Sequence, residues 1–262
     1  MRTVDINADM GESFGNWRLG NDEALSREIT TANVACGFHG SDPVTMLRTV
    51  RTAHEHGVVI GAHPGLPDLL GFGRRTMDVS GEDIYAYFVY QIGALQGVLA
   101  ANGLTLHHVK PHGVLPAMLR QSDELAGAAA DALVDLGRPL VYFPSPLDRG
   151  AFLLAAKERG LRVVGEIYPD LAYRPDGSLI IQRHKGLTDL EQAAAQVRRF
   201  LESGCVLAED GSEVPLEAES VCVHGDGPNA VEVAQTVRKA IAESGGEVGA
   251  VSATPVTAVA GS

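Results

Sequence analysis

The sequence predicts an α/β protein built as a closed or nearly closed (β/α) barrel. Seven short apolar or β-branched runs alternate with longer helical patterns along the 262 residues, and no linker divides the chain into two domains. Regular alternation of strands and helices implies a parallel sheet with right-handed crossovers. About seven such units in one chain fit a TIM-like barrel better than two separate sheets.

The predicted strands are short runs rich in aliphatic and β-branched side chains. They are Thr3–Asn7, Thr31–Cys36, Val58–Ala62, Leu106–Lys110, Leu140–Phe143, Arg162–Glu166 and Ser220–His224.

The predicted helices fill the intervals between these strands. They are Pro43–His56, Glu82–Ala101, Asp123–Leu136, Ala151–Arg159, Asp189–Glu202 and Pro228–Ser244. Asp42 before Pro43 is an expected N-cap followed by proline at the first helical position. Ser80 and Asp83 form an approximate capping box. Glycines 57, 103 and 160 stand where helices commonly end.

Two regions interrupt the alternation. Gly65–Met77 is a long loop rich in Gly, Pro and Arg, and Tyr168–Gly186 with Glu209–Pro215 resembles a hairpin excursion followed by a second turn. After Gly245 the sequence turns to small residues and loses its periodicity. We therefore expect one barrel domain over residues 1–245 and a flexible C-terminal tail over 246–262.

Composition limits the classes of partner. The net charge of -12 argues against nucleic acid or an anionic membrane, because phosphate binding needs a basic face. No apolar run reaches the roughly 18 residues that span a bilayer, and the N-terminus lacks a secretory h-region. Cys36, Cys205 and Cys222 are widely spaced and suggest neither disulfides nor a thiolate zinc site. We expect a cytoplasmic protein.

Ionisable and carboxamide side chains gather where the predicted strands end. They are Asp9, Glu12, Asn33, His39, His63, Lys110, His112, Glu166, His224 and Asp226. In a parallel barrel all strand carboxyl ends open onto one face, where active sites are built. Six separate segments therefore deliver polar groups to one end. His54 and His56 lie at a helix end instead, and His107 and His108 lie at a strand start.

Each of these residues also has a simpler structural interpretation when it is taken alone. Lys110 could be a surface lysine, Asp226 could cap the next helix, and Asp9 could be a turn residue. The run Gly71-Phe72-Gly73-Arg74-Arg75 could hold an anion or form a solvated turn. No GxGxxG, GxxxxGK[ST] or GxSxG motif occurs, which argues against a dinucleotide fold, a P-loop and an α/β-hydrolase.

Six ordered motifs resemble the LamB/YcsF family. They are Asn7-Ala8-Asp9-Met10-Gly11-Glu12-Ser13-Phe14-Gly15, Asn33-Val34-Ala35-Cys36-Gly37-Phe38-His39, Gly61-Ala62-His63-Pro64-Gly65, Gly71-Phe72-Gly73-Arg74-Arg75, Lys110-Pro111-His112-Gly113 and His224-Gly225-Asp226-Gly227-Pro228-Asn229-Ala230. The resemblance runs from about residue 3 to residue 244. It implies an irregular seven-stranded barrel of the glycoside hydrolase/deacetylase superfamily type. It also implies ATP-dependent hydrolysis of 5-oxo-L-proline to L-glutamate, carried out with two further 5-oxoprolinase subunits, B and C.

Two positions depart from the pattern of the family. Pro116 stands where the family usually has Tyr, and Leu171 stands where it tends to have Arg. An arginine is the natural partner of a carboxylate such as that of 5-oxoproline. We expect Arg74 or Arg75 to replace it, or the preferred ligand to be a different lactam.

ATP-coupled opening of a lactam needs a base for water, cations for the oxyanion and phosphate, and a proton donor for the leaving nitrogen. We assign Asp9 and Glu12 as the candidate bases and Lys110 and His112 as stabilisers of negative charge. His224 and Asp226 would form a base and the residue that orients it. The candidate substrate-binding residues are Asn33, His39, His63, Arg74, Arg75 and Glu166.

Two other functions remain open at this point. A metal-dependent amidase or deacetylase acting on another cyclic amide could use Asp9, His39 and His63 to hold a divalent metal. The second is a non-catalytic subunit that binds a small molecule or regulates an enzyme.

Overall fold

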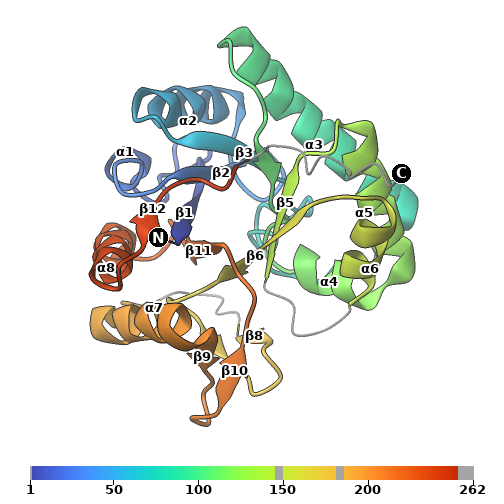
Figure 1. Ribbon diagram of the computed structural model, residues 1–262. Coiled ribbons are helices and arrows are strands. Elements are labelled where there is room, and N and C mark those ends of the chain that lie inside the picture. The colour runs from blue at the N-terminus through green and yellow to red at the C-terminus, as the bar shows by residue number, and fades with distance from the viewer. Residues whose placement is uncertain (1, 145–149, 181–185, 253–262) are drawn as a thin grey trace, which may run out of the picture.

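The computed structural model describes residues 2–144, 150–180 and 186–252. Seven parallel strands form a closed barrel with helices around it (Figure 1). The strands are β1 (Thr3–Met10), β2 (Thr31–Ala35), β3 (Val59–His63), β4 (His108–Val109), β5 (Leu140–Pro144), β6 (Val163–Ile167) and β11 (Ser220–Val223). They pair in this order, and β11 closes the barrel against β1 with Asp5 opposite Ser220. The predicted fold class and its seven strands are confirmed.

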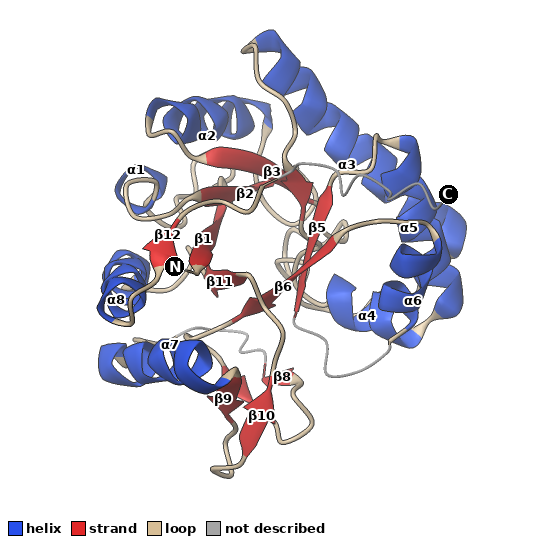
Figure 2. Cartoon of the chain, viewed as in Figure 1, coloured by secondary structure: helices blue, strands red, loops and turns tan. Residues whose placement is uncertain are grey.

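The helices form a layer outside the barrel (Figure 2), and an aliphatic core lies mainly between the helices and the strands. The helices are α1 (Asp22–Leu25), α2 (Pro43–Glu55), α3 (Gly81–Ala101), α4 (Leu115–Gln121), α5 (Asp123–Asp135), α6 (Ala151–Glu158), α7 (Leu190–Ser203) and α8 (Ala230–Glu243). The short helices α1 and α4 were not predicted. The Asp42 cap and the Ser80–Asp83 capping box form as expected.

Strand β1 shows how the sequence separates the polar interior of the barrel from the hydrophobic layer between strands and helices. Side chains alternate between the two faces of a strand. The apolar members Val4, Ile6, Ala8 and Met10 alternate with Asp5, Asn7 and Asp9, and all seven are buried. The polar set makes hydrogen bonds to other strands of the barrel, such as that between Asn7 and Glu166. The barrel interior is therefore polar, and the hydrophobic layer lies mainly between strands and helices.

Helix α3 is the one described helix that is long and apolar enough, by length and composition alone, to cross a membrane. No apolar run long enough to span a bilayer was predicted in the sequence, and within this helix Gln91 and Gln96 stand among the apolar residues. Ile84, Phe88, Ile92, Leu95 and Leu99 recur every three or four residues and are buried. This spacing places them on one face of the helix, so α3 packs as a core helix of the barrel.

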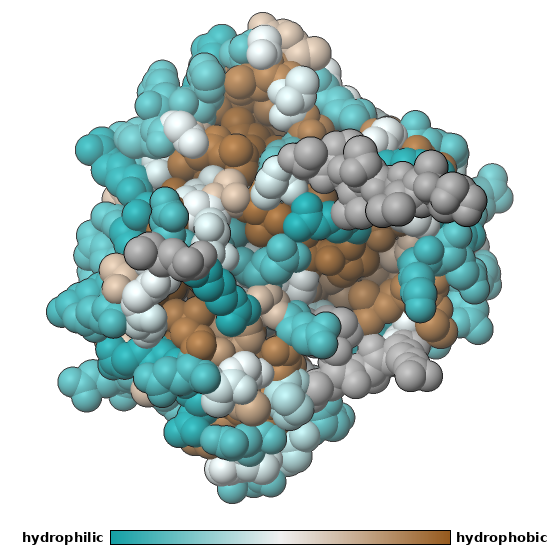
Figure 3. Space-filling model, viewed as in Figure 1, coloured by the Kyte–Doolittle hydropathy of each residue, from teal (hydrophilic) through white to brown (hydrophobic). Residues whose placement is uncertain are grey.

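The predicted excursions form two small antiparallel hairpins. Strands β7 (Ala172–Tyr173) and β8 (Leu179–Ile180) pair with each other, and β9 (Cys205–Leu207) pairs with β10 (Glu213–Pro215). Strand β12 (Glu247–Val248) then pairs with β1, so the sheet continues beyond the predicted domain boundary at 245. Most of the predicted tail, residues 253–262, lies outside the described residues. Hydrophilic residues cover much of the outer rim in the space-filling view (Figure 3).

Candidate functional site

A pocket of about 400 Å³ opens at the carboxyl ends of the barrel strands. Six of the candidate site residues line it: Asp9, His63, Arg74, Lys110, His112 and His224. Pro116 and Leu171, the two departures from the family pattern, line it as well. Asn33, His39, Glu12 and Glu166 are buried behind this surface. The structure thus brings together polar groups from strands that are far apart in the sequence.

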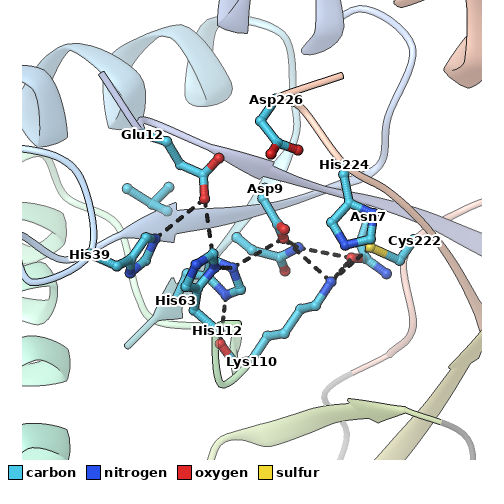
Figure 4. Close-up of polar contacts among 12 residues, drawn as sticks. Asn7, Asp9, Glu12, His39, His63, Lys110, His112, Cys222, His224 and Asp226 are labelled. Carbon is cyan, nitrogen blue, oxygen red and sulfur yellow. Dashed lines mark hydrogen bonds and ion pairs between the residues drawn. The ribbon is translucent and has the colours of Figure 1, made fainter. Parts of the chain in front are cut away.

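Five buried side chains form what we call the lysine cluster, in which the ammonium group of Lys110 is surrounded by four partners. The members are Asn7, Asp9, Lys110, Glu166 and Cys222. Figure 4 labels Asn7, Asp9, Lys110 and Cys222. Nζ of Lys110 lies 3.3 Å from Asp9 Oδ1 and 3.4 Å from Glu166 Oε2. It also donates to Asn7 Oδ1 at 3.1 Å and contacts Cys222 Sγ at 2.8 Å. Tyr168 donates its hydroxyl to the other oxygen of Glu166 at 2.5 Å.

Burial and charge act in opposite directions on the lysine cluster. Burial alone would lower the pKa of Lys110, but the carboxylates of Asp9 and Glu166, together with the adjacent thiol of Cys222, raise this pKa well above its ordinary value. Burial alone would likewise raise the pKa of Asp9, but His63 and Lys110 hold it well below the usual range. Asp9 is therefore an ionised carboxylate at the wall of a pocket.

Four other residues form what we call the imidazole cluster: Glu12, His39, His63 and His112. Oε1 of Glu12 lies 3.3 Å from His39 Nε2 and 3.7 Å from His112 Nδ1. The rings of His39 and His112 stack with centroids 3.6 Å apart. Burial, followed by the charges of Asp9 and Asp226, raises the pKa of Glu12 well above its ordinary value. Burial lowers the pKa of both His39 and His112.

The carboxylate in the candidate metal site differs from the one that was predicted. The predicted set grouped Asp9 with His39 and His63, and Nε2 of His63 does lie 3.3 Å from Asp9 Oδ1. The four potential ligand atoms that converge, however, belong to the imidazole cluster, in which Glu12 supplies the carboxylate. Gly11, whose φ of 71° is readily available to glycine, turns the chain after β1 and brings Glu12 to this place.

His224 has a different partner from the one predicted. Its Nδ1 lies 2.9 Å from Oδ2 of Asp170, which stands between β6 and the β7–β8 hairpin. Asp226, the predicted orienting residue, accepts from Arg74 Nη2 at 2.6 Å instead. The prediction of a His224–Asp226 pair is wrong, because neighbours in the sequence after a strand need not point to the same side.

The side chains of Arg74 and Arg75, neighbours in the sequence, have different partners and lie in different surroundings. Arg74 is largely buried against Asp226 and lines the pocket. Arg75 is half exposed, pairs with Asp68 and does not line the pocket. Of these two arginines, both of which were predicted to bind the substrate, the structure therefore places only Arg74 at the candidate site.

Several residues of the site were missed by sequence reasoning. Asn7 bonds to Glu166, Asn33 and Lys110 at the centre of the barrel. A ring nitrogen of His108 lies 2.7 Å from Asn33 Oδ1, although its place at a strand start had set this histidine apart from the site. The polar alternation of β1 was a signal that could have identified Asn7. Cys222 and Asp170 carried no comparable signal.

The comparisons with known proteins agree with the motifs. A profile of the LamB/YcsF family matches residues 4–256. The chain is similar to the A subunit of 5-oxoprolinase from Bordetella parapertussis, at 47% identity over 244 residues that cover 92% of this chain and 96% of that protein. It is 48% identical to the A subunit of 5-oxoprolinase from Thermus thermophilus over 249 residues, 94% of this chain and 98% of that one.

A solved structure extends the similarity to three dimensions. The crystal structure of a lactam utilization protein from Thermus thermophilus superposes with a TM-score of 0.86 at 44% identity. The match covers 95% of this chain and 100% of that one. The fold, the order of the motifs and these relatives agree over nearly the whole length. The chain belongs to the LamB/YcsF family.

Proposed function

We propose that this chain is the A subunit of a cytoplasmic, ATP-dependent 5-oxoprolinase, which opens 5-oxo-L-proline to L-glutamate together with subunits B and C. The observation that carries the proposal is Asp9, a buried carboxylate kept ionised between His63 and Lys110 at the wall of a pocket of about 400 Å³. The names of the relatives support the choice of substrate and of a multi-subunit enzyme.

The chemistry explains why ATP is needed. A five-membered lactam is a resonance-stabilised amide, and its carbonyl carbon is a poor electrophile. Phosphorylation of the carbonyl oxygen by ATP activates the ring carbon, so that a first water can attack it. When the carbon–nitrogen bond then breaks, an acyl phosphate remains, and a second water hydrolyses it. The balanced reaction converts 5-oxoproline, ATP and two waters into L-glutamate, ADP and phosphate. Because the sequence has no P-loop, we assign the phosphorylation to the complex with subunits B and C and the hydrolysis to this chain.

The side chains of the pocket suit the hydrolytic step. Asp9 accepts the proton of the attacking water, and the buried ammonium of Lys110 stabilises negative charge on the former carbonyl oxygen. His224, oriented by Asp170, delivers a proton to the ring nitrogen as the carbon–nitrogen bond breaks. In this assignment Glu166 and Asn33 position the reacting groups instead of binding the substrate, since neither lines the pocket.

Arg74 is the candidate partner of the substrate carboxylate. It lines the pocket, whereas Leu171 occupies the position at which the family tends to have Arg. Loss of a charged hydrogen bond costs roughly 1.5–3 kcal/mol, so Arg74→Ala is expected to raise KM for 5-oxoproline about 10- to 150-fold. Arg75→Ala is the matched control, with an effect within about twofold. Equal effects of the two variants, or faster turnover of 2-pyrrolidinone, which lacks the carboxylate, would contradict this role.

The experiment that tests the proposal measures glutamate and phosphate release from 5-oxoproline and ATP. Three samples are compared: this chain alone, subunits B and C together, and all three subunits. We expect glutamate only from the full set. Glutamate formation by the chain alone would contradict the division of labour, and its absence from the full set would contradict the proposed function.

A further inference from the structure

Four successive barrel strands each deliver one side chain with a potential metal-ligand atom to the imidazole cluster. Glu12 follows β1, His39 follows β2, His63 ends β3 and His112 follows β4 (Figure 4). All four are buried, and their potential ligand atoms lie within 4.8 Å of one another. We propose that this cluster binds one divalent transition-metal cation of the size and softness of Zn²⁺.

The hydrogen bonds of two rings fix where their lone pairs point. Nδ1 of His63 lies 2.7 Å from the carbonyl oxygen of Lys110, and Nε2 of His112 lies 2.8 Å from that of Phe72. A carbonyl oxygen only accepts, so both of these nitrogens carry the protons. In the neutral rings the lone pairs are then on His63 Nε2 and His112 Nδ1, which face each other at 2.9 Å.

Two nitrogen lone pairs 2.9 Å apart repel each other unless a proton or a metal cation lies between or beside them. A proton on His63 Nε2 would satisfy its contacts with His112 and with Asp9. It would leave the carboxylate of Glu12 facing the lone pair of His112 Nδ1 at 3.7 Å. One cation bound by all four side chains resolves both contacts at once.

The distances between the potential ligand atoms and the hydrogen bonds of the second ring nitrogens also fit a bound metal ion. Ligand atoms bound at about 2.0–2.2 Å lie roughly 2.8–3.6 Å from their neighbours around a tetrahedral or octahedral ion. The contacts of 2.9, 3.3 and 3.7 Å within the cluster are close to this range. Histidine ligands commonly donate their second ring N–H to a backbone carbonyl, as His63 and His112 do here. Imidazole nitrogen with one carboxylate favours zinc and its first-row neighbours over magnesium or calcium.

Two glycines make room for this arrangement. A Cβ at Gly65 would stand 2.5 Å from His39 Nδ1, and one at Gly73 would stand 2.8 Å from His112 Cδ2. Either side chain would push a ring out of place. His63 and His112 also line the pocket, so the proposed ion would border it. The site does not depend on the proposed function, because it concerns only the affinity of the chain for the ion.

The test titrates chelator-treated protein with Zn²⁺ or Co²⁺ alone. Calorimetry gives the stoichiometry and the affinity, and the visible absorption of Co²⁺ reports nitrogen ligands. We expect one equivalent to bind to the wild type. Glu12→Gln and His112→Gln should each weaken binding at least about 10-fold, while His54→Gln, a control on an exposed histidine of α2, should leave it unchanged.

Circular dichroism shows whether the variants fold. If they do not, anomalous scattering at the zinc edge from crystals of the wild-type chain decides, with a peak expected among the four side chains. The absence of stoichiometric binding overturns the proposal. Unchanged affinity in both folded cluster variants, or an anomalous peak elsewhere, overturns it as well.

Discussion

The lysine cluster and the imidazole cluster lie side by side at the same end of the barrel but balance charge differently. The lysine cluster contains its own permanent cation, because Lys110 contacts both Asp9 and Glu166. The imidazole cluster places Glu12 among rings whose charge depends on a proton or a bound ion. Asp9 touches both, through Lys110 and His63. The difference teaches that the lysine cluster neutralises its carboxylates with its own ammonium group, whereas the imidazole cluster has no permanent cation among its four side chains and is neutralised by the ion that we propose.

Asp9→Asn is expected to have the largest effect, because it removes the carboxylate that both clusters share. Loss of a general base lowers the rate about 10²- to 10⁴-fold, and the isosteric amide creates no cavity. The measurement is glutamate release by the complex assembled with the variant chain. A variant that keeps its far-ultraviolet circular dichroism and more than about half of the turnover would show that Asp9 is structural.

Lys110→Met tests whether the lysine cluster is held by its own cation. Removing one partner of a buried ion pair costs about 3–5 kcal/mol, and we expect this loss in the free energy of unfolding at a pH of about 7.5. The exposed Lys157→Met on α6 serves as the control, with a change within about 0.5 kcal/mol.

The pH dependence of that loss has a definite sign. In the wild type the pKa of Asp9 is held below its ordinary value, so its stabilisation is present above that value and is lost as the pH falls through the folded pKa. Without Lys110 the folded pKa of Asp9 rises, and a proton then relieves the buried charge. The difference between variant and wild type should therefore shrink as the pH falls from about 7.5 to about 5. A loss that stays constant, or grows, would contradict the pairing.

Asp170→Asn should have a smaller effect and distinguishes the observed partner of His224 from the predicted one. The variant loses a hydrogen bond to a charged group, worth roughly 1.5–3 kcal/mol, and we expect this loss in kcat with little change in KM. Asp210→Asn, at an exposed carboxylate of the β9–β10 hairpin that does not line the pocket, should change kcat by less than about twofold. Equal effects of the two substitutions would show that Asp170 does not position His224.

The barrel and the end at which the site lies could be predicted from the sequence. Strand–helix alternation implies a parallel barrel. In such a barrel side chains such as Asp9, His63 and Lys110 converge, because each lies at the carboxyl end of a strand and all these ends open onto one face. These predictions depend on local pattern and on a general rule of topology. They need no knowledge of side-chain direction.

The pairings could not be predicted, because they depend on contacts between distant segments. Arg74 meets Asp226 across 152 positions of sequence, and Asp170 reaches His224 from an irregular segment whose path has no periodicity. The replacement of Asp9 by Glu12 in the candidate metal set depends on the backbone conformation at Gly11. A sequence shows that a turn is available there but not where the next side chain points.

A crystal structure of this chain with saturating 5-oxo-L-proline tests most directly whether ring opening takes place where the two clusters meet. We predict that the ring occupies the pocket, with its carbonyl group facing Lys110 and Asp9 and its carboxylate on Arg74. Density for the ring elsewhere on the molecule, or an unchanged pocket at saturating ligand, would contradict the account.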